Sequence, residues 1–157
     1  MSESKGQRVV VSLDALVAQM AELRKYIENL QTQINQIQEE ISELRASSNA
    51  LSEFKSGKTE EILTPADRRG HILIKAKPVS KETVVTHIGL EYYVELPLDK
   101  AIEILTLKEK ELREASDELQ RELVRVLNYY QRLENVVNTV LTQARQQAKQ
   151  TSEKISS

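Results

Sequence analysis

Residues 13–44 read LDALVAQMAELRKYIENLQTQINQIQEEISEL, and the spacing of their apolar side chains decides the fold class. Ten of them, from Leu13 to Leu44, follow one another at gaps that alternate between three and four without a break. With Leu13 at heptad position a, eleven of the twelve a and d positions up to Leu51 are apolar. A heptad pattern this long predicts a coiled-coil helix, here over residues 12–52, with Ser12 as its N-cap.

A second heptad pattern follows Pro97 and predicts another coiled-coil helix over residues 98–150. Eleven of its fourteen a and d positions are apolar, and it contains neither Gly nor Pro. Proline suits the entrance of a helix because its fixed φ is already helical. The chain must return between the two helices, so we expect them to pair antiparallel. Residue i of the first helix should then lie roughly opposite residue 150−i of the second.

The stretch between the helices predicts β-structure. Residues 55–97 hold all three Pro and three of the four Gly, and their apolar residues alternate with a period of two. The candidate strands are residues 61–64, 72–77, 83–88 and 91–96, which predict two β-hairpins within residues 60–96. Isolated hairpins are unstable in water. We therefore expect them to pair with β-structure of other chains, the alternative being that they fold against the helix ends of their own chain.

Composition excludes several classes of function. The 157 residues carry 22 Lys+Arg and 24 Asp+Glu, so no basic field is available to attract nucleic acid. No apolar run approaches the roughly 18 residues needed to span a bilayer, and the polar first residues do not resemble a signal peptide. His71 and His87 are isolated, and no Gly-rich phosphate loop or nucleophile–base pair occurs. We expect a cytoplasmic protein without a membrane partner, and neither an enzyme nor a binder of metals or cofactors.

The flanking e and g positions become more apolar toward the helix ends that lie away from the hairpins. In the second helix four of six are apolar there, against one of six near the hairpins. The apolar flanking residues are Val17, Tyr26, Leu127, Tyr129, Val136 and Leu141. A two-stranded seam covers only the a and d positions, so this surplus favours another binding partner. The alternative is that these residues pack against a third helix or a folded-back N-terminus.

The order of these elements resembles the alpha subunit of prefoldin. The resemblance is most specific in EILTP at residues 61–65 and in ETVVTHIGLEYYVELP at residues 82–97. Two hairpins rather than one favour the alpha type over the beta type. One position departs from the family pattern, because Glu91 stands where a second Gly often precedes the aromatic pair. The type of this turn is therefore expected to differ.

The resemblance implies an α+β fold, with residues 1–157 as a single prefoldin-like domain whose hairpins join an inter-subunit β-barrel. It implies a hexamer of two alpha and four beta subunits. The family acts as an ATP-independent holdase that binds unfolded polypeptides at the coiled-coil tips and delivers them to a group II chaperonin. The competing hypothesis is a structural coiled-coil tether or assembly scaffold without clients.

The apolar surplus and the resemblance together give two sets of candidate site residues. The residues expected to bind clients are Val10, Val11, Leu13, Leu16, Val17, Leu133, Val136, Val137, Val140 and Leu141. The residues expected to mediate subunit assembly are Ile62, Leu63, Ile72, Ile74, Val84, Val85, Ile88, Tyr92 and Val94.

Overall fold

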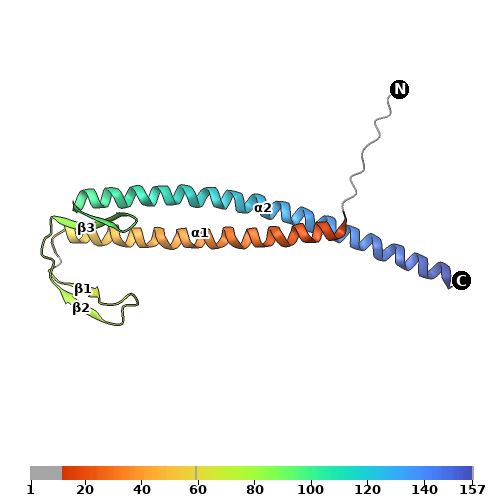
Figure 1. Ribbon diagram of the computed structural model, residues 1–157, viewed down its shortest axis with the longest axis horizontal. Helices are drawn as coiled ribbons and strands as arrows, with labels where there is room; N and C mark the ends of the chain where they lie inside the picture. Colours follow the sequence, from red (N-terminus) through yellow and green to blue (C-terminus); the bar gives the residue numbers. More distant parts are fainter. Residues whose placement is uncertain (1–11, 59, 157) are drawn as a thin grey trace, which may run out of the picture. The chain divides into compact units, whose positions relative to one another are not determined.

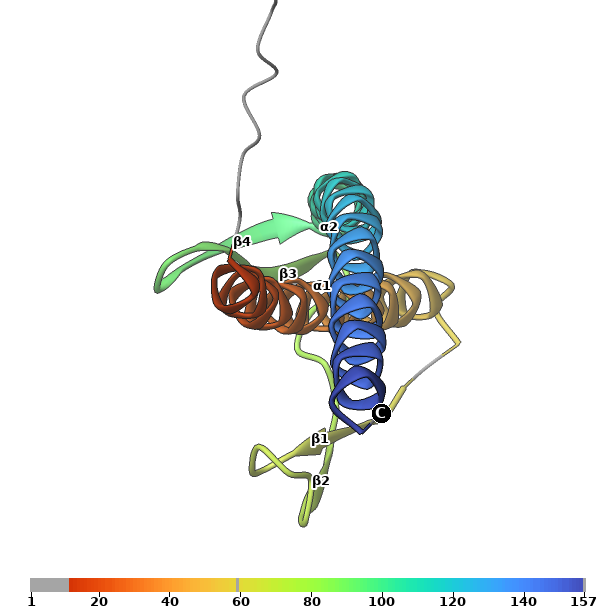
Figure 2. The ribbon, with the colours of Figure 1, turned by 90° about the vertical axis from the view of Figure 1, so that its right-hand side faces the viewer.

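The computed structural model, which describes residues 12–58 and 60–156, has one long helix before and one after two β-hairpins in the chain. The elements in chain order are α1 (Leu13–Lys55), β1 (Ile62–Pro65), β2 (Leu73–Ala76), β3 (Thr83–Gly89), β4 (Tyr92–Pro97) and α2 (Leu98–Ile155) (Figure 1). Strands β1 and β2 form one antiparallel sheet, and β3 and β4 form another (Figure 2). The α+β class predicted from the sequence is confirmed.

Local capping explains where the helices begin and end. The Oγ of Ser12 accepts a hydrogen bond from the N–H of Ala15 at 3.2 Å, so the predicted N-cap of α1 is confirmed. Helix α1 runs to Lys55, three residues past the expected end, and Gly57 follows with φ 72°. A glycine with positive φ just past the last turn is a common helix terminator. Helix α2 extends five residues past its expected end, to Ile155.

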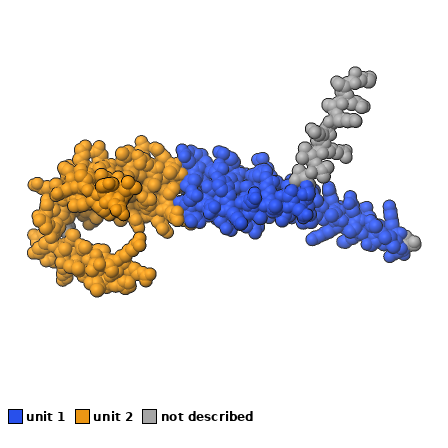
Figure 3. Space-filling model, in the orientation of Figure 1, with its two compact units in different colours: residues 1–34, 118–157 blue, residues 35–117 orange. Residues whose placement is uncertain are grey.

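The chain divides into two compact units, residues 1–34 with 118–157 and residues 35–117 (Figure 3). Within unit 1, α1 and α2 run antiparallel, since Gln19 bonds to Tyr129 and Tyr26 bonds to Glu122. Each of these partners lies within four residues of the one expected from the 150−i relation.

Unit 2 contains both hairpins and the adjoining parts of the two helices. The helices are antiparallel here as well, since Arg45 pairs with Glu109 and Lys55 pairs with Asp99. The two hairpins differ in burial. On the β3–β4 hairpin Thr86 is buried and its neighbours on the same face are half-buried, whereas every residue of β1 and β2 except Ala76 is exposed. Packing against the chain's own helices, the alternative left open by the sequence, therefore holds for β3–β4 only.

The turn between β3 and β4 takes its left-handed residue from an unexpected position. Leu90 adopts φ 50°, next to Gly89 with φ 145°, while Glu91 keeps a negative φ. The strand register shifts between His87 and Gly89 at a β-bulge. Nε2 of His87 lies 2.7 Å from the carbonyl oxygen of Leu90 and donates to it, which holds the strained turn closed. Glu91, which stands where the family often has Gly, therefore needs no positive φ, because the preceding Leu90 adopts it.

Candidate functional site

The seam of unit 1 is closed by apolar residues of both helices. Ile27, Leu30 and Val126 form a buried cluster, in which Leu30 is only 2% exposed. Half-buried residues packed against it are Leu23, Leu119, Leu123 and Tyr130. All seven occupy a or d positions of the two heptad patterns. These positions are therefore used to hold the two helices together and are not free to bind a partner.

One flank of this seam, which we call the tyrosine flank, is formed by Gln19, Tyr26, Glu122 and Tyr129. Nε2 of Gln19 donates to the hydroxyl of Tyr129 at 2.9 Å, and the hydroxyl of Tyr26 donates to Oε1 of Glu122 at 3.4 Å. Both bonds cross from α1 to α2. The tyrosine rings remain more than one-third exposed, so they present apolar surface whose polar ends are already satisfied.

The opposite flank, which we call the aliphatic flank, consists of Val17, Val124, Leu127 and Leu141. All four side chains are exposed, Val124 the most at 58%. Arg24 lies on the same flank, and its Nη2 donates to the hydroxyl of Tyr130 at 2.8 Å. That hydrogen bond raises the pKa of Arg24, and the guanidinium carbon lies 5.9 Å from the centre of the Tyr130 ring. The aliphatic side chains of this flank therefore remain in contact with solvent.

The residues expected to bind clients separate into three groups by burial. Four are exposed, namely Val17, Val136, Val140 and Leu141. Four lie in the seam, with Leu13 and Leu16 half-buried and Leu133 and Val137 buried. Val10 and Val11 lie outside the described residues. Among the members that the structure describes, the exposed group offers the most surface without separation of the helices.

The residues expected to mediate assembly are mostly exposed on the hairpins. Ile62, Leu63, Ile72 and Ile74 expose apolar surface on β1–β2 and the loop that joins its strands, as Val85, Ile88 and Tyr92 do on β3–β4. Val84 and Val94 are half-buried on the face of β3–β4 that also carries buried Thr86. So much apolar surface on two short sheets marks an interaction surface.

A groove of about 550 Å³ lies in unit 2 between the β3–β4 hairpin and the adjoining helices. Its walls include Leu44 and Leu51 from α1, Val85 from β3, and Leu105 and Lys108 from α2. Nζ of Lys108 donates to the backbone carbonyl of β3 at residue 87 over 3.2 Å, which ties the hairpin to α2. The lining is mixed, since Glu40, Glu43 and His87 also contribute to it, and its one lysine is bonded to the backbone of β3.

Two further observations concern the described residues alone. They contain no cluster of three or more His, Cys, Asp or Glu side chains placed to hold a metal ion. In the same residues, neither helix has a stretch that is both long and apolar enough to cross a lipid bilayer.

Comparison with known proteins gives a consistent result. The family model described as "Prefoldin subunit" matches residues 23–156. The chain belongs to the prefoldin family. Prefoldin subunit alpha of Sulfurisphaera tokodaii is 36% identical over 93% of each chain, and that of Saccharolobus solfataricus is 33% identical over 89% of this chain and 92% of its own. The resemblance to prefoldin alpha subunits seen in the sequence is thereby confirmed.

A solved structure shares the prefoldin fold. The filamentous PFD of Methanocaldococcus jannaschii, determined by cryo-EM, superposes with a TM-score of 0.60 at 20% identity and covers 80% of this chain and 98% of its own. Prefoldins are chaperones and not an enzyme family, and their subunits assemble with other prefoldin subunits. The exposed hairpins of this prefoldin chain agree with such assembly.

Some exposed residues of this prefoldin subunit are missing from the set predicted from the sequence. Tyr26, Leu127 and Tyr129 stand at e and g positions, so the widening of the apolar pattern does indicate them. Val124 stands at a b position, outside the e and g positions, and gives no such signal. A b position faces away from the seam, so the 58% exposure of Val124 agrees with the heptad pattern.

Proposed function

We propose that this chain is the alpha subunit of an ATP-independent holdase that binds unfolded polypeptides through unit 1 and passes them to a group II chaperonin. We propose further that it acts in the cytoplasm, in a hexamer of two alpha and four beta subunits. The observation that carries the proposal is the exposed apolar surface of unit 1, which exceeds what the seam needs. Unfolded polypeptides expose apolar segments, which gain free energy when such a surface covers them.

Weak contacts on several subunits suit this task. Each exposed valine or leucine offers only part of its side chain, so a single arm binds a client weakly. Several arms joined at their hairpins act together, because the second contact is made at high effective concentration. Apolar surface without a fixed shape also suits clients of varied sequence. Release then requires a competing receptor and no nucleotide hydrolysis, in keeping with the absence of a Gly-rich phosphate loop from the sequence.

The exposed β-hairpins support the assembly part of the proposal. A two-stranded sheet that leaves both faces and edges in water is stable only when other strands cover it. The β1–β2 hairpin is such a sheet, with Leu63 and Ile72 more than half exposed. Co-purification with a beta-type subunit, followed by native mass spectrometry, should give a mass of two alpha and four beta chains. Any other stable stoichiometry would contradict this part of the proposal.

The client-binding part is tested with a triple variant, Val17→Ser, Val136→Ser and Leu141→Ser, assembled with beta-type subunits. All three side chains are exposed in unit 1, so helix content and complex mass should stay unchanged. A light-scattering assay with a denatured test protein should show reduced suppression of aggregation. The matched control is Leu107→Ser with Val79→Ser, which removes exposed apolar side chains from unit 2.

The outcomes separate the competing hypotheses. If the triple variant suppresses aggregation as well as the unmodified complex, unit 1 is not the client site. A structural tether predicts that even the unmodified complex gives no suppression. Delivery is tested by adding a group II chaperonin without nucleotide to the client complex. The client should then move to the chaperonin, and retention on this complex would contradict delivery.

A further inference from the structure

A basic notch lies on α2 in unit 1, beside the tyrosine flank. It has a volume of about 380 Å³ and is lined by Arg125, Val126, Asn128, Tyr129 and Arg132. Residues spaced by three and four along a helix share a face, which brings the two arginines to either side of the Tyr129 ring. Val126 is buried and forms the apolar floor. The notch thus combines an aromatic wall, an apolar floor and two guanidinium groups.

The charges around the notch are not balanced. Nη1 of Arg125 pairs with Oε2 of Glu122 at 3.0 Å, and the other oxygen of that carboxylate already accepts from Tyr26. Arg132 forms no ion pair or hydrogen bond with any residue in the described part of the chain. One guanidinium group therefore remains available at the edge of an exposed apolar surface.

The chemistry of the notch selects its ligand. We propose that this notch binds the carboxylate of an Asp or Glu side chain that lies next to an apolar segment of a non-native polypeptide. A guanidinium group presents paired N–H donors that match the two oxygens of a carboxylate. Exposed Val136 follows Arg132 by one turn on the same face and offers apolar contact beside the charge. This inference rests on the proposed function and specifies which clients unit 1 prefers.

A nucleic acid fits the notch less well than a polypeptide. Arg125 and Arg132 are seven residues apart, which is about 10 Å along the helix, and Glu122 places a negative charge beside them. The chain as a whole has a net charge of −2 and would repel a polyanion. One carboxylate within an otherwise apolar segment matches one free arginine, so acidic apolar segments should be favoured over neutral or basic ones.

The test compares two fluorescein-labelled apolar peptides that differ only by Glu in place of Gln at one position. Fluorescence anisotropy measures their binding to the full chain assembled with its prefoldin partners. The Glu peptide should bind about twofold to fivefold more tightly, as expected for an exposed charge pair. This preference should shrink toward equality in about 1 M salt, where the Debye length is about 3 Å.

Variants identify the responsible residue. Arg132→Gln should remove most of the preference for the Glu peptide, and Arg125→Gln combined with it should remove the rest. Arg121→Gln is the matched control, because it removes the same charge from an exposed position of α2 outside the notch. Glutamine and arginine have similar helix propensities, so none of these variants should alter helix content.

A photo-crosslinking amino acid at Asn135, an exposed residue one turn from Arg132, restricts the readout to this subunit. The Glu peptide should give the higher crosslinking yield, and Arg132→Gln should abolish the difference. Equal yields for the two peptides, or an Arg121→Gln effect as large as that of Arg132→Gln, would overturn the inference while leaving the proposed function intact. If neither peptide binds to the complex at all, the proposed function itself fails and the inference fails with it.

Discussion

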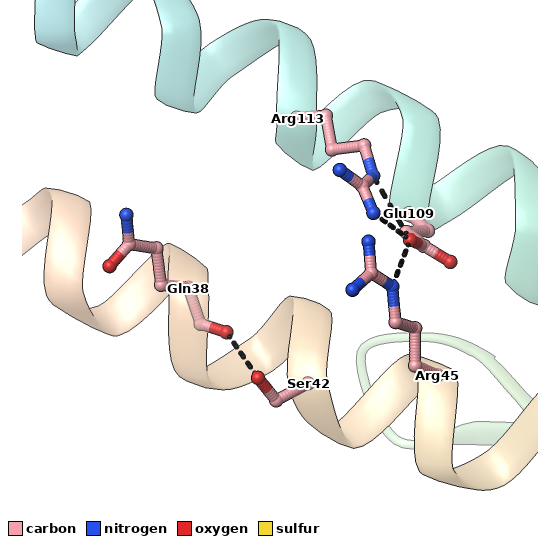
Figure 4. A network of polar contacts seen from close by, with 5 residues as sticks. All are labelled: Gln38, Ser42, Arg45, Glu109 and Arg113. Atoms are coloured by element: carbon pink, nitrogen blue, oxygen red, sulfur yellow. Dashed lines mark hydrogen bonds and ion pairs between the residues drawn. The ribbon is translucent and has the colours of Figure 1, made fainter.

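Replacing Glu109 with leucine should leave the stability of unit 2 nearly unchanged or raise it, although it removes a carboxylate that bridges two arginines. Glu109 occupies an a position of the seam, and its side chain is only 19% exposed. Its Oε1 accepts from Nε of Arg45 at 2.8 Å and from Nη2 of Arg113 at 2.6 Å (Figure 4). Ser42 does not join this network, because its hydroxyl donates to the carbonyl of Gln38 in its own helix.

The size of this change in stability follows from the burial that leucine gains and from the ion pairs that glutamate loses. A mostly buried leucine gains about 1–2.5 kcal/mol relative to an exposed one. The two ion pairs contribute about 0.2–1 kcal/mol each, because Arg45 and Arg113 are about half exposed and their charges stay hydrated. Neither arginine is stranded in an apolar environment when its partner is removed. The expected net effect of Glu109→Leu is a change in the free energy of unfolding between about −1 and +2 kcal/mol, centred slightly above zero.

Urea denaturation followed by far-UV circular dichroism measures this change, with Glu109→Gln as the matched control. The glutamine variant loses the ion pairs without gaining apolar burial, so its free energy of unfolding should fall by about 0.5–1.5 kcal/mol. The stability of Glu109→Leu should also depend less on salt than that of the unmodified chain. A leucine variant less stable than the glutamine variant would refute the reasoning, since both variants lose the ion pairs and leucine would then gain nothing from burial in the seam.

Three further predictions concern the seam and the turns. Leu30→Ala should lower the free energy of unfolding by about 2–5 kcal/mol, and half-buried Leu44→Ala by less than half as much; equal losses in urea denaturation would contradict the difference in burial. Leu90→Gly should stabilise the β3–β4 turn by about 1 kcal/mol by relieving its positive φ, seen as slower amide exchange in β3 and β4, and faster exchange would count against it. The hydrogen bond from His71, together with backbone N–H bonds, lowers the pKa of Asp67 below its unfolded value. The stabilisation that this carboxylate gives the turn is therefore present at neutral pH and should be lost as the pH falls below about 4. NMR amide exchange measures this loss, and the pH dependence should be absent in Asp67→Asn.

The sequence predicts the helices and their pairing well because both depend on a long, regular repeat. Burial in unit 1 then follows heptad position, so Leu133 and Val137 close the seam while Val136 between them is 48% exposed. Val140 shows where this rule ends. It occupies a d position yet is exposed, since its partner on α1 would lie at Leu13, where that helix begins.

The turn between β3 and β4 could not be predicted in the same way. The sequence draws attention to Glu91, whereas the positive φ belongs to Leu90. That choice depends on the β-bulge before Gly89 and on the hydrogen bond from the His87 ring, neither of which leaves a local pattern in the sequence. The different burial of the two hairpins is also a tertiary property, because both alternate apolar residues in the same manner.

Stability and binding are assigned to different heptad positions in unit 1. The buried cluster around Leu30 uses a and d positions, while exposed Val17 and Leu127 stand at e positions. Substituting an exposed flank residue removes little buried area, so it should change client binding without a comparable change in the free energy of unfolding. Substituting a seam residue such as Val126 should mainly lower the free energy of unfolding, because it removes buried contact between the two helices. A surface for varied clients can therefore change in composition without loss of the fold, provided that the seam beneath it stays apolar.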